Sequence, residues 1–423
     1  MHNAHSGAGR LALAFCLSLA ASSAFAEFNP DTSWSGDGAA PDVAGELTTD
    51  DDGNVYVLVP TSGGPYSNEG PYSVRKLAVA NGATVTGYGT DGTATIPPVG
   101  YLAGLCLDDA SDSLFLVGSV SSTTLDLRVV KLTSAGAVDE TWAEAGLATI
   151  AVPGTDGMSI GFGCAVLSDG KLLVVGSGSV TNPDYDPSDP HNQTAFITRL
   201  TAAGGLDDTF GAGGARTISM GSAALTLKKV AVAANDKIVA GGTYMTTTNL
   251  ALPTQLLFAR FTSGGAVDSS FNGGKVVVNV EQADDDDLIA MRPQSTGSIV
   301  FVAANQRYFY QFHGLVSRLN DNGTIDSSYD SAYGLVPVPT SWWTYTRGGI
   351  DPQGRVLVAG QEMDTPFNAI FRVTGRPELS VAGADGVNGT RASGGGGGGG
   401  GGAGGASLLG VLALAALARR RRS

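Results

Sequence analysis

A segment of about sixty residues recurs six times along this chain, and an aromatic residue marks each copy. In five copies an aspartate stands three residues before the aromatic, in the pattern Asp-x-(Ser/Thr)-aromatic, whereas the Tyr88 copy has Val85 in that place. The marking residues are Trp34, Tyr88, Trp142, Phe210, Phe271 and Tyr329. A repeat of this length predicts several copies of one supersecondary unit that bury their apolar faces against each other.

Two strand patterns keep the register of the aromatic. In the first, a polar turn precedes a short apolar run rich in β-branched residues, as in Asp52–Leu58, Asp169–Gly176 and Gln353–Gly360. Such a run predicts a strand buried on both faces. In the second pattern one basic residue precedes an apolar one. The basic residues are Lys76, Lys131, Arg199, Arg260, Arg318 and Arg372.

The body of the chain shows no apolar period of 3.6 residues, so we expect an all-β fold. Units of four strands at this spacing predict a six-bladed β-propeller. The chain begins with the aromatic motif Asp31–Trp34 and has no such motif after Arg372. We therefore expect the N-terminal and C-terminal segments to pair and close the ring. The alternative, a linear β-solenoid, would need capping units instead.

These motifs resemble the bacterial delta-60 repeat, a β-propeller domain of unknown function. The similarity is closest in Ala259–Phe261, Val267–Phe271, Gly273–Val276 and Leu206–Gly214, and looser in copies one, two, five and six. The resemblance covers residues 31–375. It implies a propeller fold and a surface location, and it implies no activity.

The first 26 residues have the order of a secretory signal peptide: Arg10, an apolar run from Leu11 to Ala21, and the small-residue site Ala24–Ala26. We therefore expect residues 1–26 to be removed and the propeller to occupy residues 27–380. Residues 381–405 are predicted to be a glycine-rich linker.

Residues 406–423 combine a short apolar segment with Arg419–Arg422. The segment is short against the ~20 residues of a comfortable membrane span, although a plain anchor is the alternative. The arrangement resembles the GlyGly-CTERM sorting tail of Gram-negative bacteria. That resemblance implies a transient stay in the inner membrane, removal by a rhomboid-type protease and delivery to the cell surface.

The formal net charge is −14, and removal of the two ends, which hold Arg10 and Arg419–Arg422, makes the remaining body more acidic. An acidic body argues against nucleic acid as a partner, because that affinity comes from basic residues on phosphates. We expect an extracellular monomer kept soluble by charge repulsion. Cys106 and Cys164 lie one repeat apart on expected inner strands, and we favour two buried free thiols over a disulfide bond.

Sequence signatures of catalysis are mostly missing, since only His191 and His313 remain after the signal peptide and no nucleophile elbow or zinc motif occurs. We interpret the repeated basic residues as structural partners of the motif aspartates rather than as a ligand surface. The motif aromatics are expected to pack between blades.

Insertions on a repeat scaffold concentrate on one face, which is often the binding face. The long connections between second and third strands include 63–72, 182–194, 244–255 and 305–314, and connections into inner strands include 284–287 and 342–345. We expect them to gather aromatic side chains at one mouth of the ring. The candidate ligand-binding residues are Tyr66, Tyr185, Tyr308, Tyr310, Trp342, Trp343 and Tyr345.

Asp184, Asp186 and Asp189 are spaced as candidate oxygen ligands for Ca²⁺, although solvated loops are the simpler interpretation of the same aspartates. The sequence favours a non-enzymatic surface module that binds an extracellular carbohydrate or protein. A hydrolase or lyase working at the propeller mouth is the first alternative, and a structural surface component is the second.

Overall fold

The computed structural model describes residues 31–35, 39–41, 45–61, 71–121, 126–156, 158–179, 193–221, 223–233, 236–245, 254–278, 285–307, 311–327, 334–336, 343–362 and 368–373. Regular structure in these residues consists of strands β1 to β24 and one short 3₁₀ turn, Asn272–Gly274. Within the same ranges, no helix has the length and apolar character needed to cross a membrane. The predicted signal peptide, linker and tail lie outside the described residues.

The strands form six four-stranded antiparallel sheets, which we number in chain order. Sheet I contains β2 (Glu46–Thr49), β3 (Val55–Pro60), β4 (Tyr72–Leu77) and β5 (Thr93–Ile96). Sheet II contains β6 (Tyr101–Asp108), β7 (Ser113–Ser119), β8 (Leu127–Leu132) and β9 (Leu147–Ile150). Sheet III contains β10 (Ser159–Val166), β11 (Leu172–Ser179), β12 (Gln193–Leu200) and β13 (Ala215–Ile218).

Sheet IV contains β14 (Ala224–Val232), β15 (Ile238–Met245), β16 (Gln255–Phe261) and β17 (Lys275–Val278). Sheet V contains β18 (Asp285–Pro293), β19 (Ile299–Arg307), β20 (Gln311–Leu319) and β21 (Gly334–Val336). Sheet VI contains β22 (Trp343–Ile350), β23 (Val356–Glu362), β24 (Asn368–Val373) and β1 (Ala39–Pro41). Five sheets are thus built from consecutive strands, and sheet VI combines both ends of the described chain.

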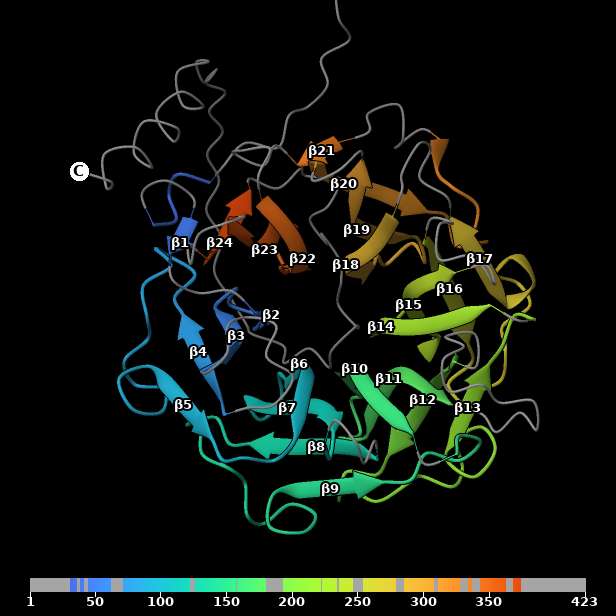
Figure 1. Cartoon of the computed structure of the whole chain (residues 1–423), viewed down its shortest axis with the longest axis horizontal. Helices are drawn as coiled ribbons and strands as arrows, with labels where there is room; N and C mark the ends of the chain where they lie inside the picture. The colour runs from blue at the N-terminus through green and yellow to red at the C-terminus, as the bar shows by residue number, and fades with distance from the viewer. Residues whose placement is uncertain are drawn as a thin grey trace, which may run out of the picture.

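The sheets stand around a common axis, with the first strand of each sheet nearest the centre (Figure 1). Each first strand contacts the first strands of the two neighbouring sheets, and β22 of sheet VI contacts β2 of sheet I. This arrangement confirms the predicted all-β propeller fold. It also defines two ends of the ring: the entry end, where first strands begin and second strands finish, and the turn end, where short turns join first to second strands.

The second strands are nearly continuous apolar runs because each lies between two strands of its own sheet and is covered by a neighbouring sheet on either face. In sheet III, Leu173, Val174 and Val175 have no exposed surface, and in sheet IV Val239 and Ala240 are equally buried. Successive side chains of a strand point to opposite faces. The alternate members of one run therefore belong to two different inter-sheet cores, as Val174 and Val175 do.

Sheet VI is completed by the N-terminal segment. Strand β1 pairs with β24, with Ala39 opposite Phe371, and the backbone N–H of Asp31 donates to the carbonyl of Arg372 at 2.9 Å. The buried Trp34 reaches from this segment to sheet I, where its Nε1 donates to the carbonyl of Ala78 at 3.0 Å. Residues from the two ends of the described chain therefore meet beside sheet I.

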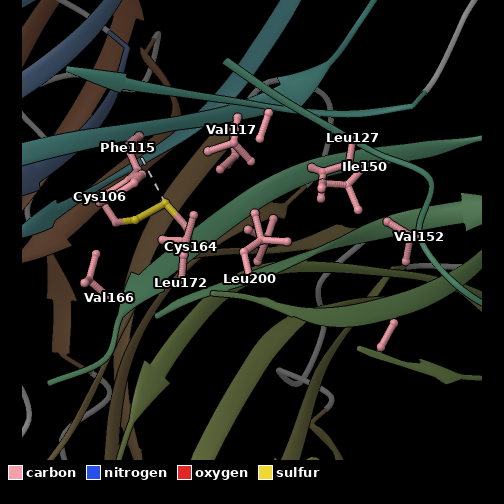
Figure 2. Packing of buried hydrophobic residues seen from close by; sticks show 14 of the residues in the cluster. Cys106, Phe115, Val117, Leu127, Ile150, Val152, Cys164, Val166, Leu172 and Leu200 are labelled. Carbon is pink, nitrogen blue, oxygen red and sulfur yellow. Dashed lines mark hydrogen bonds between the residues drawn. A yellow bond between two sulfur atoms is a disulfide. The ribbon is translucent and has the colours of Figure 1, made fainter. Parts of the chain in front are cut away.

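The expectation of two buried free thiols is wrong: Cys106 and Cys164 form a disulfide bond. Cys106 lies on β6 and Cys164 on β10, the first strands of sheets II and III, and their Cα atoms are 5.6 Å apart. First strands converge toward the axis, so two inner-strand cysteines one repeat apart come closer than sheets packed face to face would allow. The bond lies in the apolar core between the two sheets, beside Phe115 and Leu172 (Figure 2).

We expect the disulfide to contribute substantially to stability because it closes a loop of 58 residues between the first strands of sheets II and III and so restricts the unfolded chain. The double variant Cys106→Ala/Cys164→Ala should lose about 2–4 kcal/mol of unfolding free energy. Guanidinium unfolding with and without dithiothreitol measures this, and dithiothreitol should shift the midpoint of the wild type but not that of the variant. Equal midpoints for the wild type in both conditions would contradict the prediction.

Candidate functional site

In four of the sheets the repeated basic residue is held by the aspartate motif that follows it. In sheet IV, the Nε of Arg260 donates to Oδ2 of Asp268 at 2.8 Å and its NH2 group donates to Oγ of Ser270 at 3.0 Å. The guanidinium carbon lies 4.7 Å from the centre of the Phe271 ring. Its NH1 group donates to Asp321 of sheet V at 2.5 Å, so one arginine binds its own sheet to the next.

The same arrangement recurs, which confirms that the repeated bases pair with the motif aspartates. The pairs are Lys131 with Asp139, Arg199 with Asp207, Arg260 with Asp268, Arg318 with Asp326, and Arg372 with Asp31. In sheet I, where Val85 replaces the aspartate, Lys76 instead lies 3.4 Å from Asp50 and donates to the hydroxyl of Tyr56 at 2.5 Å. These charges therefore stabilise contacts within and between sheets.

Hydrogen bonds hold the motif aspartates ionised. Burial by itself would raise the pKa of Asp268, but hydrogen bonds from Ser270 and Lys237 and the nearby Arg260 hold that pKa well below its usual range. The pKa of Asp207 is lowered in the same way, where burial is opposed by hydrogen bonds from Thr209 and Lys171. A carboxyl group whose pKa is depressed on folding stabilises the folded state at neutral pH.

The sheets differ from each other at one register position on the first strand, which we call the axial layer. Each member pairs with the fourth residue of the apolar run on the second strand of its sheet. In five of the sheets, the member follows directly after a β-bulge in the first strand. The axial layer consists of Glu46, Gly104, Gly163, Lys229, Ala290 and Arg347. Three positions are thus charged and three are small.

The charged members of the axial layer meet across the axis. Lys229 Nζ lies 2.8 Å from Glu46 Oε2, although β14 and β2 belong to sheets on opposite sides of the ring. Arg347 Nε lies 3.9 Å from Oε1 of the same carboxylate. The three side chains keep 15–25% of their surface exposed, so water reaches the cluster.

Two glycines of the axial layer are required by close approach of neighbouring strands. A Cβ atom on Gly104 would lie 2.3 Å from the backbone oxygen of Phe162 on β10, and one on Gly163 would lie 2.3 Å from that of Lys228 on β14. Side chains cannot be accommodated at these distances without a backbone shift. The long side chains at the axis therefore come from sheets I, IV and VI, as Glu46, Lys229 and Arg347.

Other polar groups lie toward the entry end of this cluster. Lys228, the bulge residue of β14, forms an ion pair of 2.6 Å with Asp287 on β18. Burial raises the pKa of Tyr101, the first residue of β6, while Arg347 opposes that shift and Glu46 adds to it. Tyr101 stands three residues before the axial Gly104 on β6 and therefore lies toward the entry end of the cluster.

The turn end of the ring is acidic. Aspartates occupy the first-to-second-strand turns of several sheets, and some have structural roles: Asp50 accepts from the backbone N–H of Asn54 at 2.7 Å. Arg292 lies among these turns, donates from NH1 to the carbonyl of Ile350 at 3.0 Å, and has its pKa lowered chiefly by burial. Burial also raises the pKa of Asp51, against the effect of Arg292.

Most of the aromatic and acidic residues predicted from the sequence as a site lie outside the described residues. Those are Tyr66, Tyr185, Tyr308, Tyr310, Trp342, Asp184, Asp186 and Asp189. Trp343 and Tyr345 belong to strand β22, where they pair with Glu362 and Gly360. In the portions of the chain that the structure describes, no group of three or more His, Cys, Asp or Glu side chains could hold a metal ion.

The bounds of all six predicted connections are partly wrong, because residues at one or both ends of each connection belong to strands. Residues 285–287 and 343–345 were expected in loops that lead into inner strands, but they form the beginnings of β18 and β22. Residues 305–307 and 311–314, expected in a connection, likewise belong to β19 and β20. The strands extend because backbone pairing continues beyond the apolar run, for example between Asp286 and Asn305 and between Asn305 and His313.

The axial layer was missed in the sequence because its three charges are far apart along the chain and carry no motif. A signal was nevertheless present: Glu46, Lys229 and Arg347 stand the same number of residues before the apolar run of their second strands. Alignment of the repeats on that run would have placed them in one column.

Comparison with known proteins supports the fold and assigns no activity. Residues 233–271 match a family model described as a domain of unknown function (DUF5122) beta-propeller, a range that contains β15, β16 and the Asp268–Phe271 motif. A search of curated proteins finds no significant match.

Several solved structures are similar at low identity. A protein of unknown function from Dyadobacter fermentans has 9% identity and a TM-score of 0.51, over 83% of this chain and 99% of that one. A subtype N10 neuraminidase-like protein of A/little yellow-shouldered bat/Guatemala has 10% identity and a TM-score of 0.44, over 80% and 98%. A PL25 ulvan lyase has 8% identity and a TM-score of 0.43, over 81% and 82%. The first of these similarities supports the fold alone.

We expect Asp268→Asn to destabilise the protein by about 3 kcal/mol at pH 7, because it leaves the buried Arg260 without its main carboxylate. The folded-state pKa of Asp268 is depressed, so its contribution is present above the unfolded pKa of about 3.9 and is lost as pH falls below that value. The stability difference between wild type and variant should therefore shrink below about pH 4.

Urea unfolding of both proteins between neutral and acidic pH measures this difference. Asp169→Asn is a matched control, because Asp169 is 54% exposed and lies 3.4 Å from Lys171 on the surface; it should change stability by less than about 0.5 kcal/mol. A difference between wild type and Asp268→Asn that stayed constant down to pH 2 would contradict the assigned role of the carboxylate.

Proposed function

We propose that this protein is an exported cell-surface binding module, in which the propeller presents a ligand site at the entry end of its axis. The observation that carries the proposal is the contrast between the two sets of charges. Charges that recur in the sheets pair with the motif aspartates at sheet interfaces, whereas the charges that differ between sheets meet at the axis, where Arg347 stays 3.9 Å from its carboxylate partner. A stabilising role accounts for the recurring set, so recognition is assigned to the variable one.

The expected ligand is an extracellular carbohydrate or protein. Tyr66, Tyr185, Tyr308, Tyr310, Trp342, Trp343 and Tyr345 are proposed to contribute stacking surfaces at the entry end. The position of β22 supports this, because Trp343 and Tyr345 are on the strand nearest the axis and close to its entry end. Asp184, Asp186 and Asp189 remain a proposed Ca²⁺ site in the connection between β11 and β12.

Export and sorting complete the proposal. The signal peptide in residues 1–26 would direct the chain across the inner membrane, and residues 406–423 would hold it there until a rhomboid-type protease releases it to the surface. The propeller would then act as an extracellular monomer. The disulfide bond supports this assignment, because such bonds persist in oxidising compartments.

An array of extracellular polysaccharides and peptides tests the binding function, with the protein recovered from the cell surface. Wild type should bind a defined ligand class, and Trp343→Ala/Tyr345→Ala should weaken that binding about tenfold or more, since a lost stack is worth roughly 1–3 kcal/mol. Asp169→Asn at the turn end is the matched control and should bind as wild type. Equal binding by all three proteins would remove the entry end as the site.

The same samples test the remaining parts. Binding measured with Ca²⁺ and with EDTA should differ if the aspartate cluster holds calcium, and identical results would exclude that role. The mass of the recovered protein should lack Arg419–Arg422, and an intact tail would refute the sorting proposal.

We also infer that the six sheets are the blades of one ring closed by β1. Trp34 joins sheet VI to sheet I through a hydrogen bond of 3.0 Å to Ala78, and Trp142 joins sheet II to sheet III through one of 2.9 Å to Ala202. The closing contact therefore repeats the contact between consecutive sheets. A ring held in this way needs no separate cap.

Closure predicts that Trp34→Ala and Trp142→Ala destabilise the protein to a similar extent, by about 3–5 kcal/mol each, because each removes a buried indole from an equivalent interface. Thermal and denaturant unfolding of the two variants compares the closing interface with an internal one. A Trp34→Ala variant as stable as wild type would show that the N-terminal segment does not lock the ring.

A further inference from the structure

The axial cluster contains one carboxylate and two cations. Lys229 Nζ forms an ion pair of 2.8 Å with Glu46 Oε2. Arg347 Nε lies 3.9 Å from Oε1 of the same carboxylate, which is beyond hydrogen-bond distance. Among the described side chains, Glu46 is the only ionic partner recorded for Arg347. The three groups together therefore carry one positive charge that is not neutralised within the cluster.

The neighbouring ion pair does not remove this excess. Lys228 and Asp287 are 2.6 Å apart and neutralise each other, so neither supplies a net charge to Arg347. Asp286 is 2% exposed, has contacts of its own, and its backbone N–H donates to the carbonyl of Thr254. Tyr101 adds a hydroxyl donor on the entry side of the cluster.

A half-buried arginine for which the described residues supply no hydrogen-bond acceptor is suited to an oxyanion. Its planar fork matches the two oxygens of a carboxylate or sulfate group, and such charge-assisted hydrogen bonds are stronger than neutral ones. Arg347 is 25% exposed, so a ligand group can reach it from solvent. The backbone contacts at Gly104 and Gly163 keep the axial positions of two adjacent sheets free of side chains.

We propose that the axial layer binds one oxyanion of the ligand, a carboxylate or a sulfate group, between Arg347, Lys229 and the hydroxyl of Tyr101. This inference rests on the proposed binding function and adds the chemical class of the ligand: an acidic one. Glu46 orients Lys229 and limits the affinity, because its own negative charge repels the incoming group.

Because Arg347 is positive and Glu46 is negative, removing these two charges should change the affinity for an anion in opposite directions. Purified protein is titrated with sodium glucuronate, with sodium sulfate and with neutral glucose, at ionic strength held constant with NaCl, and the melting temperature is followed. Wild type should be stabilised by glucuronate, by sulfate or by both, with a rise of about 1–2 °C near ten times Kd. Glucose should have no effect.

Arg347→Gln should weaken the apparent Kd for the stabilising anion about tenfold or more, because a charged hydrogen-bonding group is lost. Glu46→Gln should tighten it roughly threefold or more, because a repelling charge is removed. Lys275→Gln is the matched control: it removes one positive charge from the outermost strand of sheet IV and should behave as wild type. If Arg347→Gln fails to fold, Arg347→Lys keeps the charge without the planar fork and should give a smaller loss of affinity.

Each outcome decides the proposal. Stabilisation by neither anion beyond NaCl, or equal anion affinity in wild type and Arg347→Gln, would overturn it, because a purely structural ion pair predicts no anion effect. Weaker anion binding in Glu46→Gln would also overturn the assigned geometry. An array ligand whose binding is unaffected by Arg347→Gln would refute the oxyanion site while leaving the binding function intact.

Discussion

A buried cation between an aspartate and an aromatic ring holds neighbouring sheets together, and the rest of the structure depends on it. Arg260 shows the arrangement in full: it is 1% exposed, pairs with Asp268, lies on Phe271 and reaches Asp321 in the next sheet. A buried guanidinium is costly unless its donors are satisfied. Here the hydrogen bonds satisfy those donors and, in doing so, fix how one sheet sits against the next.

The interface between the two ends of the described chain contains the same contact as the interfaces between consecutive sheets. Arg372 pairs with Asp31 at 2.9 Å and lies 5.1 Å from the ring of Trp34, as Arg199 and Arg260 do with their own motifs. The disulfide bond adds a covalent link at one interface only, between sheets II and III. Non-covalent contacts of one kind therefore recur at several interfaces, beside the apolar cores between the sheets.

Because the recurring contacts hold the sheets together at their interfaces, the residue at the axial position can differ from sheet to sheet. At the axial layer, the backbone of β10 and β14 approaches so closely that Gly104 and Gly163 tolerate no side chain, while sheets I and VI contribute Glu46 and Arg347. The resulting cluster is charged, partly exposed and unlike any interface in the same protein. The paired charges at the sheet interfaces and the charges at the axis are thus two separate sets of residues on one scaffold.

The sequence by itself determined the all-β repeat units and the partners of the repeated bases. These depend on local periodicity and on short-range spacing, such as that between Arg260 and Asp268, which recurs in four copies. Only the tertiary structure decided the disulfide bond and the axial cluster. Cys106 contacts Cys164, and Glu46 contacts Lys229, because the first strands converge on one axis. The distance between two residues across that axis cannot be deduced from their separation along the chain.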